Sequence, residues 1–416
     1  MRRHLPPALR ERDFALVWGA SLALALPTQM IAVAIGWQVY AIGRNPFHLG
    51  LIGLLEFLPL LVLALPAGHL ADRFSRRLVL TGSIALHAAI AACLLVVTLG
   101  GATQLWPFLA LAAATGMAAA LGTPAARALP PMVVSAGLLA SALSLRSAAF
   151  QMASIAGPAL GGVLFGIRPE LVYAVAIALF TLAALLVSGV RERSVPARRH
   201  GEETPGLASV LAGVGFIRRT PVLLGAISLD LFAVLFGGAV ALLPVFARDV
   251  LHVGPAGLGV LRSAPAVGAL VAAVVLAHRA VGNRAGRKLL LVVAVFGAAT
   301  IAFGLSRSFA LSLVALAVAG AADMVSVNIR STLVALASPD ELRGRVLAVE
   351  MVFISASNEL GAFESGTAAA LIGAVPAVVA GGAATLLVAA LWLRLFPGLA
   401  RVGRLEELRP ATVVDT

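Results

Sequence analysis

Long apolar runs alternate with short polar segments along the whole chain. Read in windows of about 19 residues, the apolar positions form twelve runs that are each long enough to cross a bilayer. They lie near 14–41, 48–71, 78–99, 104–124, 137–165, 170–190, 221–247, 254–280, 287–305, 309–330, 343–371 and 375–397. Such runs are typical of transmembrane helices, so the sequence predicts an all-α polytopic membrane protein with twelve helices in the lipid bilayer.

One polar stretch divides the chain into six runs and six runs. It covers residues 191–220 and is the longest polar interruption. We therefore expect a six-helix half at 1–190, a cytoplasmic linker at 191–220, a second six-helix half at 221–398 and a cytoplasmic tail at 399–416. Within the linker, residues 206–219 are either a short interfacial helix, because their apolar residues fall on one face, or a disordered segment.

The composition agrees with this class, and the charge distribution sets an orientation. The chain is 60% hydrophobic and 12% charged, with a mean hydropathy of +1.00, which excludes an ordinary soluble domain. Of the 31 Lys and Arg residues, 25 fall on one side of the membrane and four on the other if both termini are cytoplasmic. The basic residues behind the net charge of +12 therefore set the orientation of the helices in the membrane, and we expect no nucleic-acid partner.

The sequence carries no signature of catalysis or metal binding. Cys93 is the only cysteine, and the seven histidines have no metal-ligand spacing. Nucleotide-binding and nucleophile motifs, such as the Walker loop and Gly-x-Ser-x-Gly, are missing as well. We therefore expect no enzyme, no cofactor and no metal site, and an energy source other than ATP hydrolysis by this chain.

The two halves carry the same landmarks at a nearly constant spacing. The matching sets are Gly53, Glu56 and Pro59 with Gly259, Arg262 and Pro265, at an offset of 206, and Gly157 and Gly162 with Gly361 and Gly366, at an offset of 204. This repeat predicts two pseudo-symmetric six-helix halves related by an axis along the membrane normal.

A short charged segment joins the second and third runs. Gly68, Asp72, Arg73, Arg76 and Arg77 follow the pattern Gly-x-x-x-Asp-Arg-x-(Gly/Ser)-Arg-Arg. This pattern resembles the signature loop of major facilitator superfamily transporters, which implies a major facilitator fold and a conformational-switch loop that latches the two halves in one state. The alternative is that the arginines only fix topology. The carboxylate is also placed to cap the next helix.

Further stretches narrow the resemblance. Residues 229–244, 339–345 and 358–366 are similar to the bacterial branch that contains the enterobactin exporter. The resemblance implies a secondary active transporter of the bacterial cytoplasmic (inner) membrane that exports a mid-sized amphipathic small molecule, a siderophore or drug, by alternating access. Protons are the expected coupling ion, and we expect a monomer. An importer, a lipid flippase, a membrane scaffold or receptor, and an intramembrane enzyme are the alternatives.

The run at 137–165 carries a second motif. Gly157, Pro158, Gly161 and Gly162 resemble the Gly-Pro-x-x-Gly-Gly core found in exporters that exchange substrate for protons. Plain helix packing is the alternative reading, because small residues allow close helix contact and Pro158 kinks the helix.

Ionisable residues inside the apolar runs are costly unless they are paired or face water. Asp230 lies near the expected bilayer centre and Asp323 deep in its run. Each is a proton-coupling candidate, because burial disfavours the ionised form, or else a permanently paired structural residue. Glu359 and Glu364 are further polar candidates in the run at 343–371.

The repeat also places opposite charges at equivalent positions. Glu56 matches Arg262, and Arg146 matches Glu350 at an offset of 204. We expect Glu56–Arg262 to close an outer gate and Arg146–Glu350 an inner gate, unless each charge has its partner elsewhere. In the first run, Gln29, Trp37 and Gln38 are candidates for lining a substrate cavity, and packing is the alternative.

Overall fold

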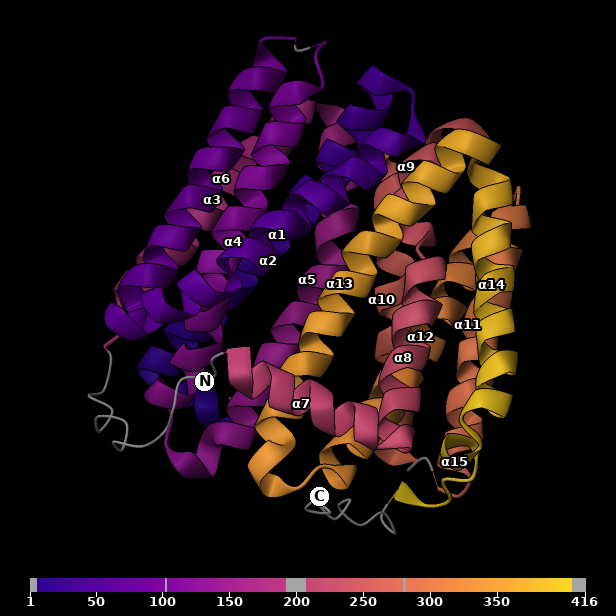
Figure 1. The fold of residues 1–416 in the computed structure, drawn as a ribbon. Helices are drawn as coiled ribbons and strands as arrows, with labels where there is room; N and C mark the ends of the chain where they lie inside the picture. Colours follow the sequence, from indigo (N-terminus) through magenta and orange to yellow (C-terminus); the bar gives the residue numbers. More distant parts are fainter. Residues whose placement is uncertain (1–5, 102, 192–206, 280–281, 406–416) are drawn as a thin grey trace. The chain divides into compact units, whose positions relative to one another are not determined.

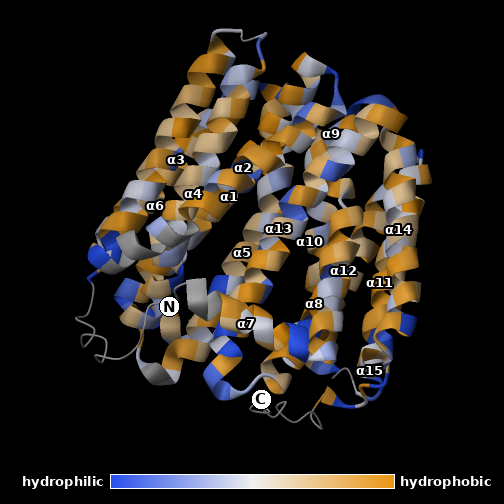
Figure 2. Cartoon of the chain, in the orientation of Figure 1, coloured by the Kyte–Doolittle hydropathy of each residue, from blue (hydrophilic) through white to orange (hydrophobic). Residues whose placement is uncertain are grey.

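The computed structural model describes residues 6–101, 103–191, 207–279 and 282–405 (Figure 1). Within these residues the regular structure is helical, and twelve helices have the length and composition to cross a membrane. The prediction of twelve transmembrane helices is therefore confirmed. Figure 2 shows hydrophobic residues along most of the length of these helices, as a lipid environment requires.

The helices follow the chain in the order expected from the apolar runs. In the first half they are α1 (Arg12–Gly43), α2 (Pro46–Arg73), α3 (Arg76–Leu99), α4 (Trp106–Val133), α5 (Leu139–Ile167) and α6 (Pro169–Ser188), with short turns η2 (Pro7–Arg10) and η3 (Ala136–Leu138). The seventh span is broken into α8 (Pro221–Phe236), η4 (Ala239–Leu242), α9 (Leu243–Val245) and the π-helical turn η5 (Phe246–Val250). The rest are α10 (Gly254–His278), α11 (Ala285–Leu305), α12 (Phe309–Ala337), α13 (Asp340–Ile372), α14 (Ala374–Leu395) and α15 (Pro397–Ala400).

Several helices run further than the apolar runs. α4 continues to Val133 and α12 to Ala337, past Arg127 and Arg330. A charge ends a hydropathy window, but it does not interrupt the backbone hydrogen bonds of a helix. Arg127 and Arg330 therefore both lie inside helices, beyond or at the end of the apolar runs.

A helix is present in the second part of the linker. It is α7 (Leu207–Arg219), which begins directly after the undescribed residues 192–206. A Cβ at Gly213 would lie 3.0 Å from the carbonyl oxygen of Arg345, so α7 packs closely on α13. The helix expected at 206–219 is thus confirmed.

By its internal contacts the chain forms two compact units. The first comprises Met1–Glu202 and Ala247–Ser263, and the second comprises Glu203–Phe246 and Ala264–Thr416. The boundaries differ from those expected at 190 and 221, because residues 247–263 pack with the first unit and α7 packs with the second. The first part of α10 therefore belongs to the first unit.

The same pairs of spans pack within each unit, which agrees with the sequence repeat. In the first unit α1 packs against α5 and α6, and α3 packs against α4 and α6. In the second unit α8, the equivalent of α1, packs against α13 and α14, and α11, the equivalent of α3, packs against α12 and α14. The two halves are therefore built alike, as the sequence predicts.

Glycines let equivalent helix pairs approach closely. A Cβ at Gly116 of α4 would lie 2.1 Å from the Glu56 carbonyl oxygen of α2. Gly320 of α12 follows Gly116 by 204 residues, and a Cβ there would lie 2.0 Å from the carbonyl oxygen of Pro265 of α10, which corresponds to Pro59, one turn beyond Glu56. Lipid tails give little hydrophobic drive for helices to associate, so such backbone contact is what holds them together.

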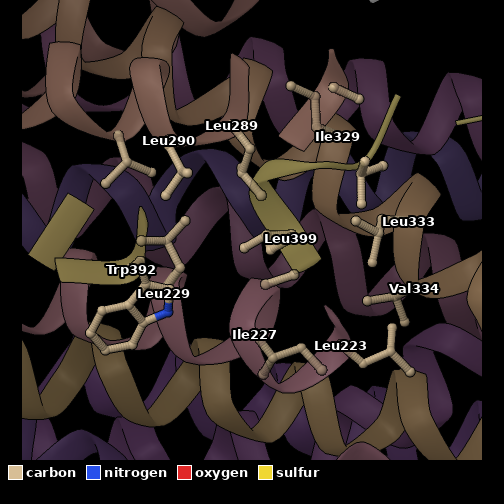
Figure 3. Packing of buried hydrophobic residues seen from close by; sticks show 14 of the residues in the cluster. Leu223, Ile227, Leu229, Leu289, Leu290, Ile329, Leu333, Val334, Trp392 and Leu399 are labelled. Carbon is tan, nitrogen blue, oxygen red and sulfur yellow. The ribbon is translucent and has the colours of Figure 1, made fainter. Parts of the chain in front are cut away.

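An apolar cluster forms the core of the second unit (Figure 3). It includes Leu229 of α8 and Ile329 of α12, together with side chains from α11, α14 and α15. Asp230 and Arg330 directly follow these two residues in the chain. The charges described below are therefore attached to helices that are fixed by apolar packing.

We expect Gly320→Ala to lower the melting temperature of the purified protein. The added Cβ has no room against the Pro265 carbonyl oxygen, so α10 and α12 must separate, at a cost of about 1–3 kcal/mol. Gly344→Ala in α13 is the matched control, because nothing lies within 4 Å of its added Cβ. Thermal unfolding in detergent measures both, and equal melting temperatures for the two variants would contradict the close contact.

Candidate functional site

A fully buried arginine marks the candidate site of the second unit. Arg330 lies on α12 and is 1% exposed, the largest side chain among those fully buried in the described residues. Placing a guanidinium in an apolar interior costs several kcal/mol unless carboxylates and hydrogen bonds compensate. Its neighbours therefore decide what this part of the protein can do.

Two buried carboxylates from other helices compensate Arg330. Its Nε donates a hydrogen bond of 3.0 Å to Oε1 of Glu350 on α13, and its Nη1 forms an ion pair with Oδ1 of Asp230 on α8. Both carboxylates are buried as well. One side chain thus links three helices of the second unit.

Asp323 lies beside this ion cluster without joining it. It precedes Arg330 by seven residues, or about two turns of α12, and so lies on the same face. Among the described residues it has no hydrogen bond or ion pair, although the charges of Asp230 and Arg330 act on it. A small cavity with room for about one water molecule is lined by Asp230, Asp323 and Ser326, and otherwise by apolar residues of α8, α11 and α12.

A break in the seventh span places the carboxylates of α8 and α13 together. α8 ends at the pair Gly237-Gly238, and a Cβ at Gly238 would lie 2.8 Å from the Gly361 carbonyl oxygen of α13. Asp230 and Glu350 each precede this close contact by about two to three turns. The glycines therefore fix the depth at which the two side chains meet Arg330.

Asp323 and the ion cluster together place one guanidinium and three carboxylates in one region of the second unit. One guanidinium and three carboxylates carry an excess of negative charge when all are ionised, and protonation of one carboxyl group removes part of it. Within the described residues, no three His, Cys, Asp or Glu side chains are placed to hold a metal ion.

The conformational-switch segment is mostly helical. α2 runs to Arg73, and only Phe74 and Ser75 separate it from α3. The side chains of Gly68 and Asp72 lie outside the described part of the structure. Ser75 rather than Asp72 is the N-cap of α3, with its hydroxyl accepting from Leu78 N at 3.3 Å, which corrects the capping expectation.

Two arginines of this segment tie α3 to its neighbours. Arg76 Nη1 donates to the sulfur of Met132 on α4 at 2.9 Å, and Arg77 Nη1 donates to the carbonyl oxygen of Val190, after α6, at 3.1 Å. These contacts hold the start of α3 within the first unit. They do not test the latch between the halves, which stays a prediction.

The glycine motif of α5 forms two close contacts. A Cβ at Gly161 would lie 2.7 Å from Met30 Cα of α1, and one at Gly157 would lie 2.6 Å from Gln29 Cβ. Gly162 instead faces the first part of α10, where a Cβ would lie 2.5 Å from the Pro255 carbonyl oxygen. Pro158 is buried between these positions. Packing is therefore one function of the motif, and a role in exchange stays a prediction.

The polar residues of α1 serve contacts within the first unit. Gln38 donates from Nε2 to Thr98 of α3 at 3.1 Å and accepts from the hydroxyl of Tyr173 of α6, so both ends of its amide are used. Gln29 donates to Ser154 Oγ at 3.3 Å, and Trp37 lies under the guanidinium of Arg248, 5.7 Å from ring centroid to Cζ. These contacts favour packing over cavity lining.

The remaining charged candidates have different surroundings. Glu350 is paired with Arg330, so the Arg146–Glu350 inner gate stays a prediction that requires this pair to rearrange. Glu364 is partly buried and accepts a hydrogen bond of 3.3 Å from Ser365 Oγ. The role of Glu359 and the Glu56–Arg262 outer gate stay predictions.

Sequence reasoning missed Arg330 as a site residue. Its signal was present, because it shares a helix face with Asp323 at a spacing of seven. It was assigned to the membrane surface since the apolar run ends there. The contact between Tyr40 of α1 and Asp249 of η5 was also missed, and no spacing rule connects residues so far apart.

The fold and the ion cluster define a membrane transporter, and comparisons with known proteins agree. Residues 5–405 match the family model for transmembrane secretion effectors. The chain therefore belongs to this family of the major facilitator superfamily, whose members move small molecules across a lipid bilayer and are not enzymes.

Relatives of known activity are exporters. The multidrug efflux pump Tap of Mycobacterium tuberculosis is 28% identical over 365 residues, covering 84% of this chain and 85% of the pump. The enterobactin exporter EntS of Escherichia coli is 26% identical over 396 residues, covering 93% and 92% of the two chains.

Solved structures share the fold. An inward-facing, occupied bacterial homologue of the human lysosomal transporter Spinster gives a TM-score of 0.74 at 14% identity, over 94% of this chain and 97% of that one. A D-xylose–proton symporter gives 0.69 at 14% identity, over 93% and 98%. At such identities the likeness concerns the fold alone.

We expect Arg330→Met to destabilise the protein strongly, by about 3–5 kcal/mol, because it leaves two carboxylates buried without their cation. The triple variant Asp230→Asn, Arg330→Met, Glu350→Gln removes all three charges and regains most of this loss. The melting temperatures of the purified single and triple variants test these two expectations. If the triple variant is no more stable than Arg330→Met, the ion cluster is not the source of the loss.

Proposed function

We propose that this protein is a proton-coupled exporter of a mid-sized amphipathic molecule. The observation that carries the proposal is the buried ion cluster of Asp230, Arg330 and Glu350 with Asp323 beside it. A passive scaffold has no evident need for a group of intramembrane carboxylates with an excess of negative charge. In membrane proteins such residues mark ion pathways.

Asp323 is the proton carrier in this proposal. It lines the small cavity and has no hydrogen bond or ion pair within the described residues, so its carboxyl group can gain or lose a proton without first breaking a contact. Asp230, in contrast, is held by Arg330. Of the two candidates, the geometry therefore favours Asp323.

Proton binding changes which groups compete for Arg330. When Asp323 is ionised, its charge attracts the guanidinium away from Asp230 and Glu350, and when it is protonated, the original ion pairs are favoured. Because these pairs join α8, α12 and α13, a change in their balance shifts the packing of three helices. This is the physical link between a proton and the conformational cycle.

The direction and the cargo class rest on the relatives. Tap is described as a multidrug efflux pump and EntS as an enterobactin exporter, so we infer export of a drug-like or siderophore-like compound. The distribution of Lys and Arg supports an orientation with both termini in the cytoplasm, and the bacterial relatives support the cytoplasmic membrane. A monomer is the simplest state for two halves that already form a complete transporter fold.

We expect Asp323→Asn to abolish transport driven by a pH gradient while exchange of cargo across the membrane continues. An amide has the shape of the carboxyl group but cannot carry a proton, so the cycle runs without coupling. Proteoliposomes loaded with a screened lipophilic compound, with and without an imposed gradient, separate the two activities. The control is Asp340→Asn, an exposed carboxylate at the start of α13.

Gradient-driven transport at the wild-type rate in Asp323→Asn would exclude this residue as the carrier. If gradient-driven movement is inward in the sense of the cell, the protein is an importer, and if a labelled lipid moves instead, it is a flippase.

The switch segment governs conversion between states in this proposal. Arg76 and Arg77 hold the start of α3 in the first unit, and we propose Asp72 as the residue of this segment that latches the two halves. The gates Glu56–Arg262 and Arg146–Glu350, the α5 motif and Glu359 remain parts of the proposed cycle. Exchanging the identities of Glu56 and Arg262 tests the outer gate, because activity lost in each neutral variant returns only if the two side chains meet.

We expect Asp72→Asn to reduce turnover by about tenfold without changing the affinity for cargo. The segment lies where α2 ends and α3 begins, so we expect it to affect the rate of conversion rather than binding. Steady-state transport and equilibrium binding on the same preparation measure the two quantities. A matching loss of affinity in a folded variant contradicts the switch role.

A further inference from the structure

Two arginines of the first unit lie at the same depth on neighbouring helices. Arg127 precedes the last residue of α4 by six positions, and Arg146 follows the first residue of α5 by seven. α4 and α5 are consecutive helices in contact, joined only by a short segment that contains η3. At 1.5 Å per residue, both arginines lie about 10 Å in from the helix ends.

α4 and α5 contact each other and hold the two arginines at the same depth, so the two positive charges repel. Within the described residues, neither lies within ion-pair distance of a carboxylate. The Nε of Arg146 is buried and has no hydrogen-bond acceptor. A buried guanidinium Nε without an acceptor, beside a second cation, is costly, which indicates that an anion completes the site.

The surface around Arg146 is amphipathic. Leu143 and Phe150 lie three residues before and four after it, on the same face of α5, and are 42% and 62% exposed. An arginine does not face lipid tails, so this face borders water or cargo. Trp18 of α1 donates to the Leu145 carbonyl oxygen at 2.9 Å and fixes α5 beside the arginine.

We propose that Arg127 and Arg146 bind the anionic group of an amphipathic cargo, with Leu143 and Phe150 contacting its apolar part; this assignment rests on the transport function proposed above. A carboxylate, sulfonate or phosphate offers the oxygen acceptors that two guanidinium groups require. Arg127 is exposed and therefore accessible to such a group. The cargo site then lies in the first unit and the proton site in the second.

In this assignment the partner of Arg146 is an anion, and not Glu350 as expected for the inner gate. Glu350 already holds an ion pair with Arg330 at 3.0 Å, whereas Arg146 has none among the described residues. If Glu350 were the true partner of Arg146, its replacement by Gln would change anion binding as much as replacement of Arg146.

The test uses two dyes with the same ring system and opposite net charge, the anionic sulforhodamine B and the cationic rhodamine 6G. The full chain is placed in nanodiscs of phosphatidylcholine, and equilibrium binding is measured by fluorescence anisotropy against empty nanodiscs. We expect the protein to bind sulforhodamine B more tightly than rhodamine 6G. Arg146→Gln and Arg127→Gln should each weaken sulforhodamine B binding about tenfold, or about 1.4 kcal/mol, and leave rhodamine 6G binding unchanged.

Control variants separate binding from folding. Arg146→Lys keeps the positive charge and should restore most of the affinity, and Arg307→Gln, an exposed arginine between α11 and α12, should have no effect. Removing one of two repelling cations should leave the melting temperature of Arg127→Gln unchanged or raise it. If Arg127 instead stabilised the fold, Arg127→Gln would lower the melting temperature.

Three results would overturn the proposal: wild-type protein that binds neither dye, a preference for rhodamine 6G, or equal sulforhodamine B binding by wild type, Arg127→Gln and Arg146→Gln. The binding measurement needs no pH gradient. Its result therefore holds even if Asp323→Asn still transports cargo with the gradient and the proton proposal fails.

A lipid headgroup has the same anionic chemistry as a soluble cargo. The binding measurement is therefore repeated in nanodiscs that contain phosphatidylglycerol. Weaker sulforhodamine B binding in wild type but not in Arg146→Gln identifies a lipid phosphate as an occupant of this anion site. Unchanged binding assigns the site to soluble cargo.

Discussion

The burial of one guanidinium sets the conditions for the second half of the protein. Arg330 is 1% exposed, and taking its charge out of water is costly even after the surroundings relax. The cost is offset because Asp230 and Glu350 reach it from two other helices. α8, α12 and α13 are therefore tied to one side chain. A change in the charge of its neighbours, such as the proton binding proposed at Asp323, would therefore act on all three helices.

Elsewhere the helices are held by close backbone contact rather than by charge. Gly116 and Gly320 occupy equivalent positions and bring equivalent helix pairs together, and Gly161 does the same for α5 and α1. Close backbone contacts of this kind permit only one favourable packing of the two helices, so each helix pair is rigid. The ion cluster differs, because Arg330 has two partners and a third carboxylate nearby. In the second unit, a small change in free energy at this cluster can therefore shift the equilibrium between different ion pairings of Arg330.

The sequence predicts the twelve helices and the repeat well, because apolar length and glycine spacing are local properties. It predicts the site less well. Hydropathy ended one apolar run shortly before Arg127 and another at Arg330, since a charge lowers a window average even where the helix continues. The partners of Arg330 come from two other helices, α8 and α13, and no spacing rule finds them. Gln38 was a cavity candidate for its polarity alone, yet its amide joins α1 to α3 and α6.

The separation of a cation pair and a carboxylate cluster between the two units has an energetic consequence for export. If an anion with one negative charge leaves the cell while one proton enters, both movements carry positive charge inward. In a cell with a negative interior, each charge contributes about 2.3 kcal/mol per 100 mV, so the two together contribute about 4.6 kcal/mol, besides the pH gradient. A cationic cargo exchanged for one proton would gain nothing from the potential. If Arg127 and Arg146 bind the cargo as proposed, they select the class of cargo for which the membrane potential and the proton gradient act in the same direction.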